Sequence, residues 1–475
     1  MDCPERWHTA PVTAIETKVP AARWLTVLVG TFSMMCPWAS SPGLSLALCI
    51  AFLTGAALVI ATLTRLVAVR DLPVRPLLWL MAAVTACGVV VTSGITLAAG
   101  ANPPLVIVLT VVLLALGVGG VFAVDRPRRH LVVLAGVAWA VLVVLYTTTW
   151  DWVIDVDDFL VGGMDALLRG QSPYAITVPD IYPAEVSNRI YGSGIVQDGR
   201  IAYGFAYLPA PLLLDLPAHL LGDPVWMHAL VVAGGVCLAW TLASDRLARA
   251  AVVVLAASPS TPVLIANYWV ESLMIGFLVL AVWGMQRASA WPVVVGMGIL
   301  FSTKQYAIYV VPAVWSVARR AGLRVALGGG ALAALVVVPV ALMDVHAFWR
   351  SAVSFQLDLP FRVDAVSFLP AARLVAGDLP PWLYVVLPVL GLGVSALVAW
   401  RTRPGPTAFA LGLGLGLLVT VVFSKQSFFN YFAFIGAALL MAGVTWPLDD
   451  PVRPRQTREP SSQGSRGERG ISSTR

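Results

Sequence analysis

Long, continuous apolar runs dominate this sequence and restrict what the chain can fold into. Each run is about 15–25 residues long, close to the roughly 20 residues that a helix needs to cross a bilayer. Of the 475 residues, 59% are hydrophobic and only 12% are charged, whereas about 25% of a soluble domain is charged. The runs do not alternate apolar and polar residues, which excludes a transmembrane β-barrel. The sequence therefore predicts an all-α polytopic membrane protein and excludes a cytosolic enzyme.

The runs predict about 14 membrane-spanning helices. They are expected at 22–39, 44–64, 77–99, 104–124, 130–149, 225–243, 250–266, 269–287, 291–303, 305–318, 322–342, 381–400, 406–423 and 428–446. The short helices 291–303 and 305–318 form either a thin hairpin with Lys304 at its outer tip or a re-entrant pair. A cytoplasmic N-terminal tail, residues 1–21, and an extra four-helix transmembrane segment, 22–129, are expected to precede a core at 130–446. The polar, Arg-, Ser- and Pro-rich tail 447–475 is predicted to be disordered and cytoplasmic.

The segment 206–221 decides the predicted orientation of the chain. It contains three prolines, Asp215 and His219, which make it a poor spanning helix. If it lies on the outer surface as an interfacial helix, all clusters of arginine fall on one side, as expected for the cytoplasmic face. These clusters are Arg65/Arg70/Arg75, Arg126/Arg128/Arg129, Arg246/Arg249, Arg319/Arg320/Arg324 and Arg401/Arg403. Two long outer loops, 150–224 and 343–380, then carry any chemistry. Only three of the 31 basic residues are lysines, which suggests a GC-rich bacterial genome and hence the bacterial inner membrane.

The first outer loop opens with a cluster of carboxylates. Asp151, Asp155, Asp157 and Asp158 fall within a few residues of one another. Neighbouring carboxylates raise one another's pKa, which suits a general base that takes a proton from a hydroxyl group. In an extended segment Asp155 and Asp157 would point the same way, so a divalent metal is conceivable there. The alternative interpretation is a solvated acidic start of the loop.

The residues after this cluster resemble a known family. Asp158-Phe159 is followed by a short amphipathic helix, by Leu167–Tyr174 with the pattern Leu-Leu-x-Gly-x-Ser-Pro-Tyr, and by Tyr207–Pro211. This order resembles the first outer loop of GT-C membrane glycosyltransferases, and is most similar to the bacterial branch around glycosyltransferase family 87. The resemblance covers about residues 130–446.

The resemblance implies a GT-C-like bundle with interfacial helices on its outer face. It also implies transfer of a sugar, mannose or arabinose, from a polyprenyl-phosphate donor to a glycan or glycolipid acceptor. In the family an acidic residue of this loop activates the acceptor, which points here to Asp157 or Asp158 and then to Asp155. The sequence lacks the tyrosine that commonly follows the Asp-Phe pair, so the choice among the three stays open.

Two of the three lysines share a context. Lys304-Gln305 and Lys425-Gln426 both stand at predicted outer helix ends. Basic residues that set the topology are expected on the cytoplasmic side, so this bias does not explain a cation at an outer helix end. A lipid phosphate in the outer leaflet, by contrast, needs a compact positive charge. The sequence therefore predicts that Lys304 or Lys425 binds the phosphate of the donor. The alternatives are snorkelling to lipid headgroups or a structural salt bridge to Glu271.

Further polar residues at outer helix ends and in the outer loops complete the candidate site. Arg362 and Arg373 are candidates for phosphate binding. Candidates for contact with the sugar or the acceptor are Glu271, Asn267, Tyr174, Gln305, Gln426 and Asn430. A carboxylate such as Glu271 in an apolar helix costs about 2–3 kcal/mol unless it has a partner, although an acid at a helix start is favoured by the helix dipole. No metal site beyond the Asp cluster is predicted.

These observations favour an inverting glycosyltransferase, whose partners are the lipid-linked donor, the acceptor and the bilayer, without nucleic acid. The runner-up is a secondary transporter or lipid flippase, which would place charges near helix centres. Here the charges gather at helix ends. A non-catalytic scaffold would have no need of the Asp cluster.

The predicted orientation can be tested by cysteine labelling of whole cells. Ser193→Cys should react with a membrane-impermeant thiol reagent, because loop 150–224 is predicted to face outward. Ser244→Cys and Arg246→Cys should react only after the membrane is permeabilised. The reverse pattern would overturn the orientation.

Overall fold

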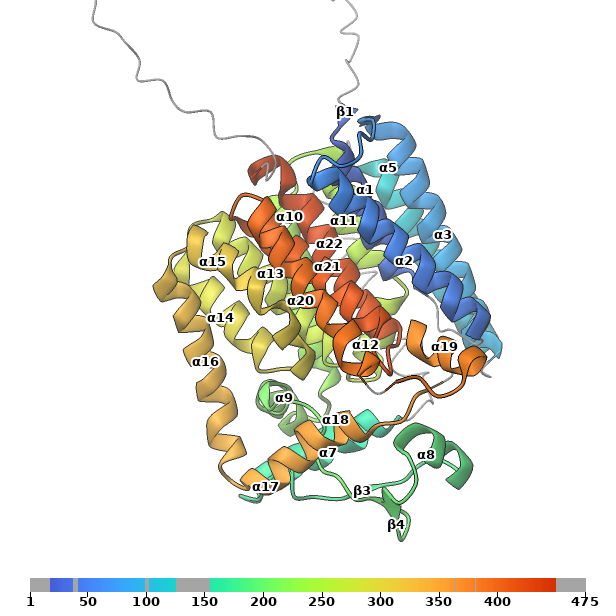
Figure 1. Cartoon of the computed structure of the whole chain (residues 1–475), viewed down its shortest axis with the longest axis vertical. Helices are drawn as coiled ribbons and strands as arrows, with labels where there is room; N and C mark the ends of the chain where they lie inside the picture. Colours follow the sequence, from blue (N-terminus) through green and yellow to red (C-terminus); the bar gives the residue numbers. More distant parts are fainter. Residues whose placement is uncertain are drawn as a thin grey trace, which may run out of the picture.

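The computed structural model describes residues 18–36, 42–98, 102–124, 154–362, 364–380 and 382–449. The predicted helix at 130–149 and most of the two predicted tails lie outside the described residues. The chain forms a bundle of helices, and a layer of short helices and loops covers one end of it (Figure 1). The other end carries β1, where the described chain begins.

The bundle helices are α1 (Ala21–Met34), α2 (Pro42–Leu63), α3 (Val74–Ala98), α4 (Pro103–Leu114) continued by η1 (Ala115–Gly119) and α5 (Gly120–Ala123), α10 (Val225–Leu242), α11 (Arg246–Ala257), α12 (Ser260–Ala266), α13 (Glu271–Gln286), α14 (Ala290–Phe301), η2 (Gln305–Ala313), α15 (Val314–Arg320), α16 (Leu323–Ala341), α20 (Leu383–Arg401), α21 (Pro406–Val422) and α22 (Phe429–Asp449). The remaining elements are α7 (Asp155–Leu168), α8 (Ala184–Tyr191), α9 (Ala210–Leu220), α17 (Val345–Phe348), η3 (Trp349–Ser354), α18 (Phe355–Asp358), α19 (Phe368–Ala376) and the strands β1 (Lys18–Val19), β2 (Leu72–Pro73), β3 (Val178–Pro179), β4 (Val196–Gln197) and β5 (Arg200–Ile201).

Several of these helices are suited to a bilayer. Within the described residues, seven are long and apolar enough to cross a membrane, and the bent pair α11–α12 would make an eighth. Three further apolar helices, α13, α14 and α21, are shorter. The prediction of an all-α membrane protein is therefore confirmed, while the figure of about 14 crossings stays a prediction.

Two predicted helices are wrong in their local structure. The run 250–266 is broken by a bend of 40° between α11 and α12, where Ser258 is extended and Pro259 follows. Proline restricts the residue before it to extended backbone, which ends α11. The run 305–318 begins as the tighter 3₁₀ segment η2 and becomes α-helical only at Val314. Pro312 lies in η2 and has no N–H to donate to an α-helical hydrogen bond.

Most residues of the N-terminal helix α1 are buried in the bundle. It packs against α22, where a Cβ at Gly30 would lie 3.2 Å from the carbonyl oxygen of Gly436. Small residues allow such close approach of two helices. Arg23, which is buried, pairs with Asp245 at 2.6 Å and also donates to the carbonyl of Gly443. The beginning of the predicted extra segment is thus joined to the last helix and to α11.

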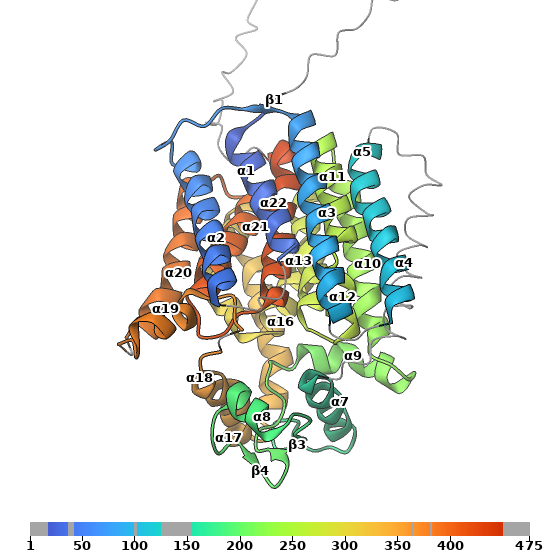
Figure 2. The ribbon, with the colours of Figure 1, turned by 90° about the vertical axis from the view of Figure 1, so that its right-hand side faces the viewer.

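The two predicted outer loops lie together at one end of the bundle (Figure 2). We call residues 154–220 and 345–362 the loop layer. It has its own apolar core, which includes Phe159, Tyr174 and Phe355. Ser351 joins its two segments, since the Ser351 hydroxyl donates to the Tyr174 carbonyl and accepts from the Gly204 N–H. The layer is therefore a packed body on the end of the bundle.

The interfacial segment 206–221 forms the eleven-residue helix α9 within this layer. It is not among the helices long enough to cross a membrane. The helix ends that carry the described arginine clusters lie at the opposite end of the bundle, which agrees with the charge argument (Figure 1). Which end faces the cytoplasm stays a prediction.

Candidate functional site

A cavity of about 460 Å³ lies between the loop layer and the ends of the bundle helices. Five residues proposed from the sequence line it together: Asp155, Lys304, Arg362, Gln426 and Asn430. The other lining residues are Ile154, Val156, Phe159, Tyr182, Val186, Arg189, Ile190, Tyr191, Ala206, Tyr207, Trp269, Phe355, Gln356, Leu359, Asp364, Phe428 and Tyr431. The cavity combines two carboxylates, Asp155 and Asp364, with several cations and aromatic rings.

Of the clustered carboxylates proposed from the sequence, Asp155 is the one that lines the cavity. It is the first residue of α7, after the extended residue Ile154. Its two oxygens accept hydrogen bonds from the hydroxyl groups of Tyr191, at 2.6 Å, and Tyr182, at 3.4 Å. Burial raises the pKa of the Asp155 carboxyl, while the Tyr191 hydroxyl, the charge of Arg362 and the Tyr182 hydroxyl act in the opposite direction. The two tyrosines fix the carboxylate in one orientation.

Asp157 and Asp158, which the resemblance favoured, do not line the cavity. The expectation of an extended segment was wrong, because Asp155 begins a helix. Positions two apart on a helix face nearly opposite sides, whereas in a strand they share a side. Burial, followed by the charges of Asp158 and Asp155, raises the pKa of Asp157 to about 7. Its Oδ1 has no hydrogen-bond partner among the described residues.

Lys304 occupies the inner wall of the cavity in the turn between α14 and η2. It is 5% exposed, and its Nζ donates to Glu271 Oε1 at 2.6 Å. Three tyrosine rings surround the ammonium: Tyr431 at 4.2 Å, Tyr207 at 5.0 Å and Tyr306 at 5.1 Å from the ring centroids. The salt bridge that the sequence analysis gave as the structural alternative is thus present. An ammonium has three N–H donors, so the ion pair leaves donors for a further acceptor.

Two buried acceptors near Lys304 lack partners among the described residues. They are Oε2 of Glu271, a fully buried side chain, and Oδ1 of Asn430, whose residue is 5% exposed. An unsatisfied buried acceptor costs about 1–3 kcal/mol. Because Asn430 lines the cavity, a ligand that brings hydroxyl or amide donors would satisfy its oxygen.

The remaining predicted cations differ in their surroundings. Arg362 lines the cavity, pairs with Asp364 at 2.5 Å and lies over the ring of Phe428. Arg373 is more exposed, pairs with Asp378 and is not a lining residue. Lys425 does not line the cavity, and its Nζ donates to the carbonyls of Leu357 and Leu359 at the end of α18. Burial lowers the pKa of Lys425.

The two Lys-Gln pairs share a structural role. Gln305 donates to the carbonyls of Ala206 and Ala352, one on each segment of the loop layer. Gln426 donates to the carbonyl of Pro360. Each glutamine therefore fastens the loop layer to a turn between two bundle elements, a role that their position in the sequence did not indicate.

Two other candidates form hydrogen bonds within the protein. The hydroxyl of Tyr174, whose side chain is buried, donates to the carbonyl of Tyr207. Asn267 is buried and donates to the carbonyl of Val263 in its own helix. Neither lines the cavity.

Sequence reasoning missed Tyr182, Tyr191 and Arg189, which line the cavity. Tyr191 and Arg189 lie on α8, an amphipathic helix of eight residues. A basic and an aromatic residue on one short helix were the available signal, but only the fold shows that α8 closes over Asp155.

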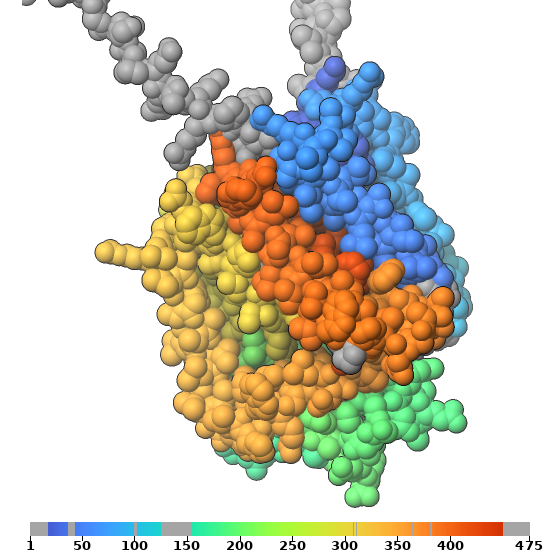
Figure 3. Space-filling view, in the orientation of Figure 1, coloured from blue at the N-terminus to red at the C-terminus, as the bar shows by residue number. Residues whose placement is uncertain are grey.

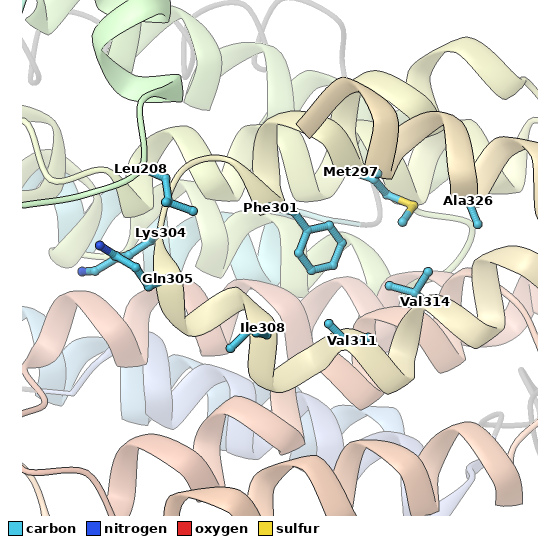
Figure 4. Close-up of a pocket in the computed structure, with 10 residues that line it drawn as sticks. Leu208, Met297, Phe301, Lys304, Gln305, Ile308, Val311, Val314 and Ala326 are labelled. Atoms are coloured by element: carbon cyan, nitrogen blue, oxygen red, sulfur yellow. The ribbon is translucent and has the colours of Figure 1, made fainter. Parts of the chain in front are cut away.

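An apolar groove of about 470 Å³ meets the cavity at Lys304, which lines both. Three walls contribute side chains at helical spacing (Figure 4). The first wall is α14, with Met297 and Phe301, and the second is α16, with Ala326 and Gly330. The third wall runs along η2 to the start of α15, with Gln305, Ile308, Val311 and Val314. Leu208 lies at the end of the groove near Lys304. In a 3₁₀ helix residues three apart stand in one line, so the 3₁₀ conformation of η2 aligns Ile308 and Val311. The surface is hollowed between α16 and α20 (Figure 3).

The described residues contain no group of three His, Cys, Asp or Glu side chains that could hold a metal ion. Asp155 and Asp157 leave α7 on different sides, so this pair does not form the metal site that an extended segment would allow.

Comparison of the chain with models of protein families, with curated proteins and with solved structures gave no match. The resemblance to GT-C glycosyltransferases therefore rests on the loop motifs alone.

The raised pKa of Asp157 predicts a pH-dependent stability. In the folded protein this carboxyl keeps its proton up to about pH 7, whereas in the unfolded chain it releases the proton near pH 4. Stability should therefore fall as the pH rises from about 4 to about 7 and then stay at the lower level. Asp157→Asn should leave the melting temperature at pH 4 unchanged and raise it by a few degrees at pH 8.

The measurement is thermal unfolding of the purified protein in detergent over this pH range. Asp198→Asn is the matched control, because Asp198 is exposed and should leave the pH profile as in the wild type. If the melting temperature of Asp157→Asn fell with rising pH as steeply as that of the wild type, the prediction would be wrong.

Proposed function

We propose that this protein is an integral membrane glycosyltransferase that moves a sugar, mannose or arabinose, from a polyprenyl-phosphate donor to a hydroxyl group of a cell-envelope glycan or glycolipid. The reaction takes place in the cavity between the loop layer and the bundle. The outer face of a bacterial inner membrane is the location that the charge distribution of the sequence favours.

The observation that carries this proposal is the position of Lys304. It lines both the cavity, with its charged and polar side chains, and the apolar groove. A lipid-linked sugar has the same division, since its sugar is polar, its phosphate is charged and its chain is apolar. With the phosphate at Lys304, the sugar would lie in the cavity and the chain in the groove.

The chemistry follows from the groups around the cavity. Asp155 accepts the proton of the acceptor hydroxyl, and the oxygen attacks the anomeric carbon of the donor. The bond between that carbon and the phosphate oxygen breaks, and the bonding electrons leave with the polyprenyl phosphate. Attack opposite to the leaving group inverts the configuration of the anomeric carbon. Tyr191 and Tyr182 hold Asp155 in place for this step.

Lys304 acts on the leaving phosphate mainly through hydrogen bonds, because Glu271 already balances its charge. The charge of Arg362 is likewise balanced by Asp364. Arg189 on α8 also lines the cavity, and its exposed side chain can approach the phosphate. A charge-assisted hydrogen bond contributes about 1.5–3 kcal/mol. The free oxygen of Asn430 suits a sugar hydroxyl.

The alternative function, a secondary transporter or lipid flippase, also uses a groove for a lipid chain. Movement of a lipid does not need a general base such as Asp155 at one end of the bundle. Loss of transfer with retained lipid movement on mutation of Asp155 separates the two functions.

The first test replaces the proposed base. Asp155→Asn keeps size and removes basicity, and should lower the turnover of sugar transfer by about 10²–10⁴-fold. Asp158→Asn is the matched control on the same helix, and should keep transfer within about twofold because Asp158 does not line the cavity. Transfer is measured in nanodiscs with labelled polyprenyl-phosphate mannose and arabinose and an envelope extract as acceptor. Full transfer by Asp155→Asn would remove this residue from the mechanism.

The second test concerns Lys304. Removing it alone would leave the charge of Glu271 buried without a cation beside it, which costs about 3–5 kcal/mol. We therefore combine Lys304→Met with Glu271→Gln, so that both charges disappear together. Loss of the charge-assisted contact should weaken the binding of polyprenyl phosphate by about 10–100-fold.

Binding is measured on purified protein in nanodiscs. Lys425→Met serves as the control and should bind polyprenyl phosphate like the wild type, because Lys425 does not line the cavity and already donates to the carbonyls of Leu357 and Leu359. Equal affinity of the double variant and the wild type would exclude Lys304 as a phosphate ligand and leave Arg362 as the next candidate.

A further inference from the structure

The apolar groove has a definite length. The nine residues of η2, Gln305–Ala313, form one of its walls, and at a rise of about 2.0 Å per residue they extend for about 18 Å. Its polar end is at Lys304 and Gln305, and its far end is at Val314 and Ala326 (Figure 4). Half of a hydrocarbon core of about 30 Å is about 15 Å, so the groove is about as long as one leaflet is thick.

The far end has room for a branched chain. Ala326 and Gly330 are one helical turn apart on α16 and supply little side-chain volume to the wall. A Cβ added at Gly330 would meet no other atom within 4 Å. On the facing wall the side chains of Ile308 and Val311 are more than half exposed. An apolar surface of this kind, with polar groups only at one end, fits a single hydrocarbon chain whose headgroup is at Lys304.

We propose that this groove binds only the first three to four isoprene units of the donor lipid and that the rest of the chain extends into the bilayer. An isoprene unit adds four chain bonds of about 1.5 Å, or about 5 Å after allowance for bond angles, so about 18 Å of groove holds three to four units. The proposal rests on the proposed function, which supplies the polyprenyl-phosphate donor. Beyond that function, the proposal states which part of the lipid the protein recognises.

The test maps the chain by photolabelling and needs no sugar transfer. A long polyprenyl phosphate without sugar carries a carbene precursor on the third isoprene unit or on the terminal unit. It is bound to the full-length protein in nanodiscs, irradiated, and located by mass spectrometry of the labelled peptides. The third-unit probe should label η2, α14 or α16, and the terminal-unit probe should label mainly lipid.

Gly330→Leu fills the groove and should lower labelling by the third-unit probe at least tenfold. Gly234→Leu is the matched control. It also replaces an exposed helical glycine with open space around its Cβ, but lies on α10, away from the groove. This control should label as the wild type does.

Three outcomes would overturn the proposal. The terminal-unit probe could label the same groove peptides, or Gly330→Leu could be labelled as strongly as the wild type. Alternatively, a photoreactive diacyl phospholipid could label the groove peptides without being displaced by excess polyprenyl phosphate. The last would identify a phospholipid site. Groove labelling in a protein that transfers no sugar would refute the proposed function alone. Sugar transfer without groove labelling would refute this inference alone.

Discussion

The ion pair between Lys304 and Glu271 is the interaction on which the site depends. Glu271 begins α13, and Lys304 lies in the turn after α14, so the pair joins two apolar helices at the end that faces the loop layer. Both side chains are buried, and removal of one partner from such a pair costs about 3–5 kcal/mol. The pair therefore holds a cation where the cavity and the groove meet, within a ring of tyrosines that packs around it.

The loop layer depends on the same turns. Gln305, next to Lys304, donates to carbonyls from both of its segments, and the second Lys-Gln turn donates to carbonyls in the last turn of α18 and just after it. These contacts position α7 and α8 over the bundle, with Asp155 between two tyrosines. The repeated dipeptide thus has one common structural role through glutamine, while its two lysines meet different partners.

Asp155 and Asp157 illustrate how local structure separates similar residues. They are two positions apart and share a residue type, yet only Asp155 faces the cavity. Burial and its carboxylate neighbours give Asp157 a pKa of about 7, a value suited to a general base. A base must nevertheless lie within reach of the hydroxyl proton, so geometry favours Asp155.

The sequence by itself determined the class of fold. Apolar runs of spanning length leave the helix as the structure that satisfies the backbone in lipid, and prolines with Asp215 predicted that the segment around α9 does not cross. It also placed Asp155, Lys304 and Arg362 among the candidate site residues, although it favoured Asp157 or Asp158 over Asp155 as the base. Only the tertiary structure decided which carboxylate enters the cavity, that Glu271 neutralises Lys304, and that Tyr182 and Tyr191 hold Asp155. Those contacts join residues far apart in the chain, and they depend on helix phase and on the packing of the loop layer, which no local pattern of residues specifies.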